Sequence, residues 1–197
     1  MNTQQLRQHI KIKRRTLSEA AREGHASRMR ANLTESGLLD QHQKLGFYWS
    51  SAGEMPTQRL LELANQAGKD CYLPVIDSGG HNFLHFAPFH SSAELRNNKF
   101  SIPEPLHSHQ QLIEGEQLDL VFVPLVAVDK AGNRVGMGKG YYDRTFQFMR
   151  APRPQITPLL VGLAYEFQRV ERLEPQSWDV PLAMLITEKS CYDFRQR

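Results

Sequence analysis

The sequence predicts an α/β protein, a three-layer αβα sandwich built on a mostly parallel, open, Rossmann-like sheet. Apolar strand-like runs alternate with helical segments along the chain. Two of these runs, LDLVFVPLVAV (118–128) and PLLVGLAY (158–165), are almost continuously apolar, as in strands buried on both faces of a parallel sheet. A length of 197 residues suits one generous α/β domain.

Two helices are expected at the N-terminus. Residues 3–17 place three aliphatic side chains near one face and basic side chains on a second face. Ser18 looks like the N-cap of a second helix, SEAAREGHASRMRANL. Gly24 is a weak point within that second helix, because glycine is a poor helix former.

A strand, a helix and a pair of strands follow. KLGFYWSS (44–51) is a compact, aromatic-rich strand candidate. A helix is expected from about residue 57 to 67, since Gly68 fits the C′ position that ends a helix. CYLPVI (71–76) and FLHFAPF (83–89) are strand-like runs separated by a Ser-Gly-Gly turn.

The second half contains a long polar segment and further strands. Residues 90–117 are polar and irregular. The expected order after them is a strand at 118–128, a glycine-rich loop, a helix at about 143–149, and strands at 158–165 and 182–187. Ligands of such sheets bind beyond the carboxyl ends of strands, so the loops after residues 51, 128 and 165 are the expected site.

Charge is unevenly distributed along the chain. The net charge is +3, but residues 1–30 hold eight basic and two acidic side chains, so the remainder is slightly acidic. A uniformly basic nucleic-acid-binding protein is therefore a poor description.

Cysteine content and hydropathy favour a cytoplasmic chain that does not enter a membrane. Cys71 and Cys191 lie too far apart for a disulfide framework or a zinc motif, which suggests a reducing compartment. The N-terminus lacks the apolar run of a signal peptide, and the apolar segment 118–128 is too short to span a bilayer.

The most informative segment is VPLVAVDKAGNRVGMGKGYYDR (123–144). Glycines at alternate positions let the backbone approach a ligand and turn N–H groups toward one point, which suits phosphate oxygens. A helix starting after Gly140 adds its positive N-terminal end. Arg134 and Lys139 supply charges, and Asp143 can hold Mg²⁺ against phosphate.

The spacing alone leaves a plainer interpretation open. Walker A needs Ser or Thr after Gly-Lys, and the dinucleotide fingerprint needs G-x-G-x-x-G, whereas this loop has G-x-G-x-G. A flexible hairpin whose glycines serve only turns is the alternative. Phosphate binding is favoured because the glycines, cations, tyrosines and acid all follow a buried strand.

This segment resembles the signature of the 5-formyltetrahydrofolate cyclo-ligase (5,10-methenyltetrahydrofolate synthetase) family, roughly P-G-x-A-F-D-x-x-G-x-R-L-G-x-G-x-G-Y-Y-D. The chain departs from it at Leu125 and Val128, which are apolar and affect packing more than chemistry. The matching positions are Pro124, Ala127, Asp129, Gly132, Arg134, Gly136, Gly138, Gly140, Tyr141, Tyr142 and Asp143.

The resemblance extends over nearly the whole chain. Four further segments match family motifs in the same order. They are LRQHIKIKRRTLS, the segment from YWSSAGEMPT to CYLPVI, KFSIPEP, and the segment from VGLAYEFQ to WDVPLAMLITE. The resemblance therefore implies a single cyclo-ligase domain over residues 1–197.

The family's activity implies an enzyme of folate and one-carbon metabolism. It is an ATP- and Mg²⁺-dependent ligase that cyclises 5-formyltetrahydrofolate to 5,10-methenyltetrahydrofolate, releasing ADP and phosphate after phosphorylation of the formyl oxygen. The implied partners are small molecules, a reduced folate and ATP as co-substrate, with neither nucleic acid nor membrane. A monomer or weak homodimer is expected.

By the resemblance, the glycine-rich loop and the N-terminal helix bind ATP. The implied contacts are Thr3, Arg7, Arg134, Val135, Gly136, Met137, Gly138, Lys139, Gly140, Tyr141 and Tyr142, of which Arg134, Lys139 and Tyr142 are assigned as catalytic. The family usually has Lys where this chain has Thr3. Without the resemblance, Arg7, Lys11 and Arg15 read as a solvated helix face.

The folate and metal contacts are also carried over from the family. Trp49, Glu54, Glu104 and Tyr142 are the implied folate contacts, and Tyr165 and Gln168 are expected in the same cleft. Asp143 and Asp179 are the implied Mg²⁺ ligands. From the residues alone, core is the more frequent role for Trp49 and a turn former the better interpretation of Asp179, whereas Glu54 reads equally as a helix N-terminal acid.

Two other functions remain open on the sequence. A doubly wound sheet with a phosphate loop also suits a sugar-phosphate isomerase, which needs no ATP. The basic N-terminal region suits nucleic-acid binding, although no aromatic residues are interleaved with the cations.

Overall fold

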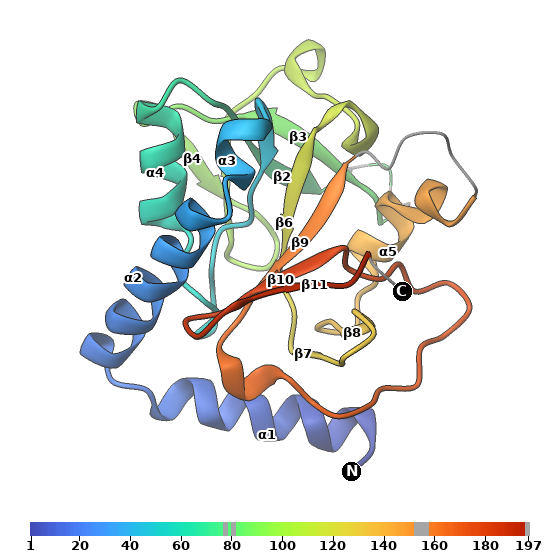
Figure 1. Ribbon diagram of the computed structural model, residues 1–197. Coiled ribbons are helices and arrows are strands. Elements are labelled where there is room, and N and C mark those ends of the chain that lie inside the picture. Colours follow the sequence, from blue (N-terminus) through green and yellow to red (C-terminus); the bar gives the residue numbers. More distant parts are fainter. Residues whose placement is uncertain (77–78, 80–81, 152–157, 196–197) are drawn as a thin grey trace.

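The computed structural model describes residues 1–76, 79, 82–151 and 158–195, in which a seven-stranded sheet is the central element (Figure 1). The strand order is β11-β10-β9-β6-β1-β2-β3, and only the edge strands β3 and β11 pair antiparallel. The strands are β1 (Lys44–Gly46), β2 (Asp70–Ile76), β3 (Leu84–Pro88), β6 (Leu120–Val123), β9 (Leu159–Leu163), β10 (Met184–Ile186) and β11 (Cys191–Asp193). The predicted mostly parallel α/β sheet is therefore confirmed.

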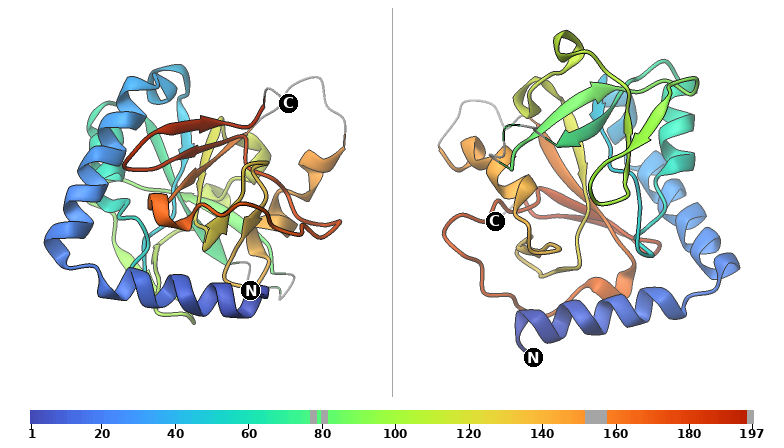
Figure 2. Two further views of the ribbon diagram at one scale, coloured as in Figure 1. Left: turned by 60° about the horizontal axis from the view of Figure 1, so that its bottom comes forward. Right: turned by 180° about the vertical axis from the view of Figure 1, so that it is seen from behind.

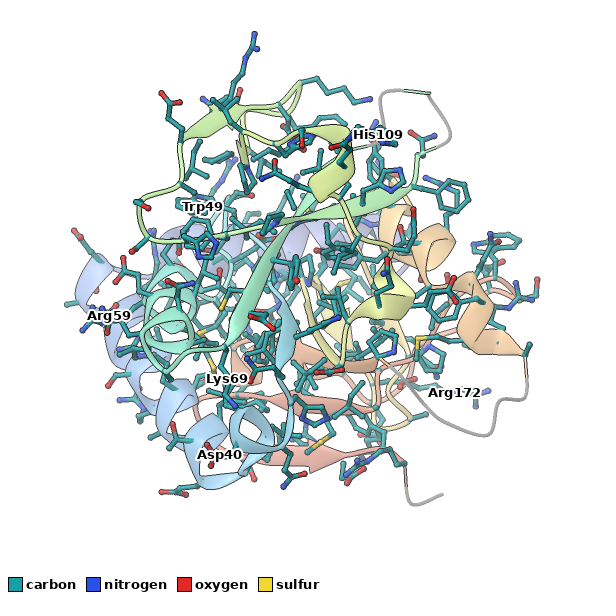
Figure 3. All side chains as sticks on the ribbon, turned by 90° about the horizontal axis from the view of Figure 1, so that it is seen from above. Asp40, Trp49, Arg59, Lys69, His109 and Arg172 are labelled. Atoms are coloured by element: carbon teal, nitrogen blue, oxygen red, sulfur yellow. The ribbon has the colours of Figure 1, made fainter. Side chains whose placement is uncertain are left out.

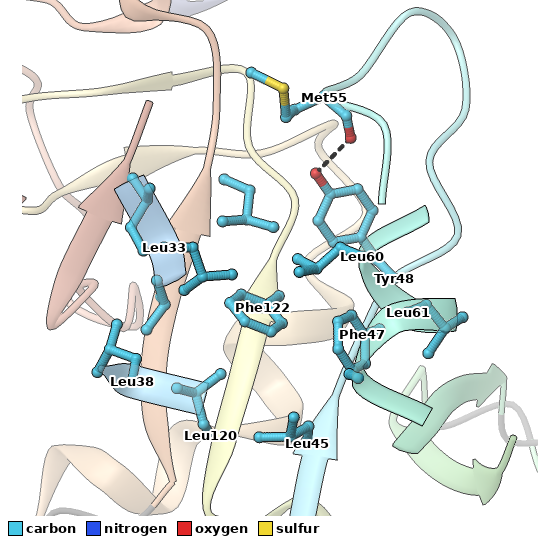
Figure 4. Packing of buried hydrophobic residues seen from close by; sticks show 14 of the residues in the cluster. Leu33, Leu38, Leu45, Phe47, Tyr48, Met55, Leu60, Leu61, Leu120 and Phe122 are labelled. Atoms are coloured by element: carbon cyan, nitrogen blue, oxygen red, sulfur yellow. Dashed lines mark hydrogen bonds between the residues drawn. The ribbon is translucent and has the colours of Figure 1, made fainter. Parts of the chain in front are cut away.

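Helices cover both faces of the sheet (Figure 2). On one face α2 (Glu19–Glu35), α3 (Leu38–Gln41) and α4 (Gln58–Gln66) enclose the larger core. On the other face the smaller core is closed by α5 (Tyr141–Thr145), the short helical turn η3 (Gln147–Arg150) and the segment around Val180 and Leu182. Figure 4 shows Phe47 and Phe122 packed in the larger core, with ring centroids 4.9 Å apart.

The helix α1 (Thr3–Thr16) lies across one end of the sheet, beside the hairpin of β7 (Ala127–Val128) and β8 (Arg134–Val135) (Figure 1). Ile10 and Arg14 are its buried residues. A second hairpin joins β4 (Leu95–Asn97) to β5 (Pro103–Pro105). The remaining helical turns are η1 (His109–Gln111), η2 (Gly115–Gln117) and η4 (Glu166–Gln168).

Local capping explains where the predicted helices begin and end. Ser18 accepts a hydrogen bond from the Ala21 N–H and caps α2 as predicted. At the C-terminal end of α4, Gly68 has a φ of 74° and its N–H donates to the carbonyl of Asn65. The N–H of Lys69 donates to the carbonyl of Ala64. This is a Schellman motif, and the left-handed conformation explains the glycine at this position.

Several boundaries differ from those that the sequence predicts. The apolar run 118–128 divides at Pro124, which lacks an N–H for the ladder, so its second half pairs with β8 instead of the central sheet. Strand β1 ends at Gly46 rather than residue 51, because the chain turns toward α4; there the hydroxyl of Tyr48 donates to the carbonyl of Met55 at 3.1 Å (Figure 4).

The other differences lie in short elements. The helix predicted at 143–149 begins earlier, at Tyr141, and changes to 3-10 geometry after Thr145. The irregular segment 90–117 contains the β4–β5 hairpin, and strand β11 was not predicted. Most of the Ser-Gly-Gly turn lies outside the described residues. Among the described helices, none is long and apolar enough to cross a membrane.

Two glycine substitutions test the packing of this fold. Gly162→Ala is expected to lower the free energy of unfolding by about 1–3 kcal/mol, because its Cβ would lie 2.7 Å from the buried side chains of Leu125 and Leu182. Gly24→Ala is expected to raise it by about 0.5–1 kcal/mol, since the nearest atom to its Cβ, in Arg28, is 3.8 Å away. Urea denaturation measures both; a stabilised Gly162→Ala would contradict the packing described here.

Candidate active site

A pocket of about 780 Å³ opens beyond the carboxyl ends of β1, β2 and β6. Its walls come from the N-terminal half of α1, the segment after β1, the β4–β5 hairpin, the glycine-rich loop and the segment 173–179. Its lining includes every residue assigned above as an ATP, folate or metal contact, namely Thr3, Arg7, Trp49, Glu54, Glu104, Arg134, Val135, Gly136, Met137, Gly138, Lys139, Gly140, Tyr141, Tyr142, Asp143 and Asp179. The loops after residues 51 and 128 meet here as expected, whereas the chain after 165 contributes only from Leu173 onward.

The glycine-rich loop lies against α1. Arg7 donates from Nε to the carbonyl of Gly136 at 2.8 Å, and its guanidinium passes within 3.6 Å of the position that a Cβ on Gly138 would occupy. Gly138 and Gly140 have φ values of 95° and 68°, which only glycine adopts readily. The loop therefore needs glycine at positions 138 and 140 for its backbone geometry.

Backbone donors in this loop are free for a ligand. Within the described part of the chain, no acceptor faces the N–H groups of Gly136 to Gly140. Lys139 is exposed beside them and adds a full positive charge. Converging backbone N–H groups next to a cation are a general way of binding phosphate oxygens.

Arg134 points its charge at a carboxylate. It donates from Nη2 to Oδ1 of Asp143 at 2.7 Å and from Nη1 to the carbonyl of Val180, and its side chain is only 4% exposed. Burial lowers the pKa of Arg134, while Asp143, Asp179 and Tyr142 act in the opposite direction. The sequence predicts a phosphate-binding cation here; the structure shows that the guanidinium also fixes Asp143.

The two predicted metal ligands lie on the same wall of the pocket. Asp143 also accepts the N–H of Val180 at 3.2 Å, and Asp179 accepts the N–H of Gln176 at 2.8 Å. No group of three metal-ligating side chains occurs among the described residues. Two carboxylates beside a glycine-rich loop fit Mg²⁺, which in proteins takes one or two carboxylates and completes its shell with phosphate oxygens and water.

Glu54 also lines the pocket, in a tight turn after β1. Its Oε2 accepts the N–H of Ser51 at 3.0 Å, and Ala52 and Gly53 have φ values of 49° and 76°. Burial raises the pKa of Glu54, whereas the hydrogen bond from Ser51 and the charge of Arg14 lower it. The turn therefore holds the carboxylate in a preformed position.

Aromatic and polar side chains surround this end of the pocket. The buried hydroxyl of Tyr142 has no hydrogen-bond partner in the described structure, and burial raises its pKa. Trp49, labelled in Figure 3, meets the ring of Phe89 edge-on. Glu104 accepts from the N–H of Ile76 at 3.1 Å and from the side-chain amide of Asn98, so it ties the β4–β5 hairpin to β2.

Two residues expected in the cleft are instead part of its support. Tyr165 and Gln168 are fully buried and do not line the pocket. The hydroxyl of Tyr165 donates to the backbone carbonyl of Glu54 at 3.3 Å, and Gln168 donates to the carbonyls of Leu125 and Val126 at 2.9 Å. Both hold the backbone on which the pocket is built.

Sequence reasoning missed several residues of the site. The exposed side chains of Phe100, Met137 and Trp178 line the pocket, and of these three only Met137 was predicted to contact a ligand. Phe100 and Trp178 stand in the family-like segments KFSIPEP and SWDVP, which was the available signal. Arg14, next to the pocket and fully buried, stands in the family-like segment LRQHIKIKRRTLS, but no role was assigned to it.

Comparison with known proteins gives one consistent result. A family model described as the 5-formyltetrahydrofolate cyclo-ligase family matches residues 1–188. The 5-formyltetrahydrofolate cyclo-ligase of Haemophilus influenzae is 36% identical over 185 residues, covering 92% of this chain and 97% of that protein. The Escherichia coli K12 protein of the same name is 37% identical over 147 residues, covering 75% and 79%.

Solved structures show the same similarity. The NMR structure of Aquifex aeolicus 5,10-methenyltetrahydrofolate synthetase superposes with a TM-score of 0.84 at 32% identity, covering all of this chain and 95% of that one. The Mycoplasma pneumoniae 5,10-methenyltetrahydrofolate synthetase shares the fold, with a TM-score of 0.69 at 24% identity over 95% of this chain and 99% of that one.

Proposed function

The chain belongs to the 5-formyltetrahydrofolate cyclo-ligase family, a family of ligases, and from this premise we propose that it converts 5-formyltetrahydrofolate to 5,10-methenyltetrahydrofolate with ATP and Mg²⁺. One observation carries the proposal. A single pocket of about 780 Å³ joins a glycine-rich loop and two carboxylates to a half-buried acid flanked by aromatic rings. That combination suits a nucleotide at one end and a reduced folate at the other.

The chemistry requires activation of the formyl group, because an amide oxygen is a poor leaving group. The formyl oxygen attacks the γ-phosphorus of ATP; the new O–P bond forms as the bond to the bridging oxygen breaks, and ADP leaves. The p-aminobenzoyl nitrogen then attacks the formyl carbon and loses its proton. The carbon–oxygen bond breaks, inorganic phosphate departs with the formyl oxygen, and the methenyl ring is closed.

On the nucleotide side, the chain's task is to position the triphosphate and neutralise its charge. The free N–H groups of Gly136 to Gly140 face the phosphates, with Arg7 and Lys139 as cations and Thr3 nearby at the start of α1. Arg134 acts from below by fixing Asp143. Asp143 and Asp179 would hold Mg²⁺, which when bound supplies charge neutralisation on the transferring phosphoryl group.

On the folate side, Glu54 accepts hydrogen bonds from the amino and ring N–H groups of the pterin, as a carboxylate does well. Trp49 and Tyr142 offer flat faces to the aromatic parts of the substrate. Glu104 lines the same end and holds the hairpin that closes it. The residues therefore fix the formyl oxygen relative to the phosphates rather than attack it themselves.

The direct test is an absorbance assay. Purified protein given 5-formyltetrahydrofolate, ATP and Mg²⁺ is expected to show the rise in near-ultraviolet absorbance that accompanies methenyl formation, together with one ADP per turnover. Omitting ATP is the control and should abolish the signal. Folded protein without an ATP-dependent signal would exclude this function, and turnover of a sugar phosphate without ATP would favour an isomerase.

A further inference from the structure

Arg14 is a cation enclosed by the fold. Its side chain is among the largest fully buried ones, with 1% of the residue exposed. Nη2 donates to the carbonyl of Leu125, whereas Nε and Nη1 are buried with no partner in the described structure. A buried charge is costly unless an opposite charge compensates it, so the position of Arg14 requires an explanation.

The compensating charge is Glu54, across the wall of the pocket. The turn that carries Glu54 lies directly on α1: a Cβ on Gly53 would stand 3.1 Å from Cβ of Arg14. Burial lowers the pKa of Arg14 and raises that of Glu54, and the charge of each group opposes the shift of the other. The two groups therefore stabilise each other's charged form through the floor of the pocket.

The other groups that face Glu54 carry no positive charge. Ser51 donates through its backbone N–H. Three tyrosines surround the same region as neutral phenols, and burial raises the pKa of each. They are Tyr48 just after β1, Tyr142 of α5 and Tyr165 beyond β9. Arg14 is thus the cation that acts on this carboxylate within the described surroundings.

We propose that Arg14 is a positioning residue for Glu54: from outside the pocket it keeps the carboxylate charged and holds its turn in place for the pterin, without touching either substrate. The inference rests on the proposed function, since it assumes that Glu54 receives the folate. The inference gives different roles to the two arginines of α1, because Arg7 contacts the glycine-rich loop and Arg14 packs against the turn of Glu54.

The experiment compares Arg14→Met with Arg15→Met, which removes the same charge from an exposed neighbour on the same helix. Arg14→Met is expected to raise KM for 5-formyltetrahydrofolate by about tenfold or more, because the hydrogen bonds between the pterin and the charged carboxylate of Glu54 are weakened. KM for ATP should stay within about twofold. The variant should fold, since the carbonyl of Leu125 still accepts from Gln168.

The pH profile separates positioning from general damage. Without Arg14 the pKa of Glu54 rises, so the acid limb of kcat/KM for the folate should move to higher pH, and Arg14→Lys should move it back. Arg15→Met should leave the limb in place. An unmoved limb in Arg14→Met, or equal increases of KM for folate and ATP, would overturn the inference.

If Arg14→Met folds poorly, a double variant still tests the inference. In Glu54→Gln no buried carboxylate needs the cation, so adding Arg14→Met should fold and leave KM for folate at the Glu54→Gln value; a further tenfold increase would contradict the inference. Circular dichroism and thermal melting verify folding. Wild-type protein without ATP-dependent turnover would remove the proposed function and this inference together, whereas active wild type with unaffected Arg14 variants would remove the inference alone.

Discussion

Glu54→Gln is expected to raise KM for 5-formyltetrahydrofolate by about 10- to 100-fold, because hydrogen bonds to a charged group contribute roughly 1.5–3 kcal/mol. Glutamine preserves the volume, and its carbonyl oxygen can still accept the N–H of Ser51, so the turn should keep its shape. The charge that attracts the pterin N–H groups is lost. Initial-rate measurements with each substrate varied in turn give the two KM values.

The matched control is Glu62→Gln, which neutralises an exposed carboxylate on α4, away from the pocket. It should leave both KM values unchanged. KM for ATP in Glu54→Gln should remain within about twofold of wild type, since no hydrogen bond joins Glu54 to the glycine-rich loop in the described structure. A parallel loss for both substrates would show that Glu54 supports the pocket as a whole rather than the folate.

Asp143→Asn is expected to lower kcat by about 100-fold or more at fixed Mg²⁺, since even residues that only support metal ligands contribute 10- to 100-fold to metal affinity. It also removes the carboxylate that pairs with the buried guanidinium of Arg134. Breaking a buried ion pair costs about 3 kcal/mol of stability or more. A lower melting temperature should therefore accompany the lost activity.

Asp179→Asn separates these two effects, because Asp179 has no hydrogen bond to Arg134 and accepts instead from the N–H of Gln176. It should raise the Mg²⁺ concentration needed for half-maximal rate with a smaller loss of stability than Asp143→Asn. The exposed Asp40→Asn on α3 serves as the control for a charge change alone. Unchanged Mg²⁺ dependence in both site variants would exclude these carboxylates as metal ligands.

Local patterns in the sequence predicted most of the fold. The cap at Ser18, the helix end at Gly68 and the continuous apolar run of β9 depend on neighbouring residues, so they can be read along the chain. Strand β11 was missed because its three residues alternate little and gain their stability by pairing with β10. Pro124 gave a visible signal that the long apolar run would divide.

The sequence identified most of the residues that line the pocket, but not which of them pair with one another. The family-like motifs identified residues that line one pocket, including Glu54 and Asp179. That Arg134 binds Asp143 depends on how the loop folds back onto α5. Arg14 and Arg15 are chemically identical neighbours, yet one is buried and the other exposed, since helix rotation and the turn above it decide which guanidinium is enclosed.

The helix α1 has a consequence for the spacing of the pocket. Arg7 and Arg14 are seven residues apart on the helix. At 3.6 residues per turn and 1.5 Å per residue they share a face and are separated by about 10 Å along a stiff axis. α1 thus sets a fixed distance between the loop that Arg7 contacts and the turn of Glu54. One residue inserted between them would rotate the second arginine by about 100° and remove it from register. Substitutions at the exposed positions between these two arginines are therefore tolerated more readily than any change in the number of residues that separate them.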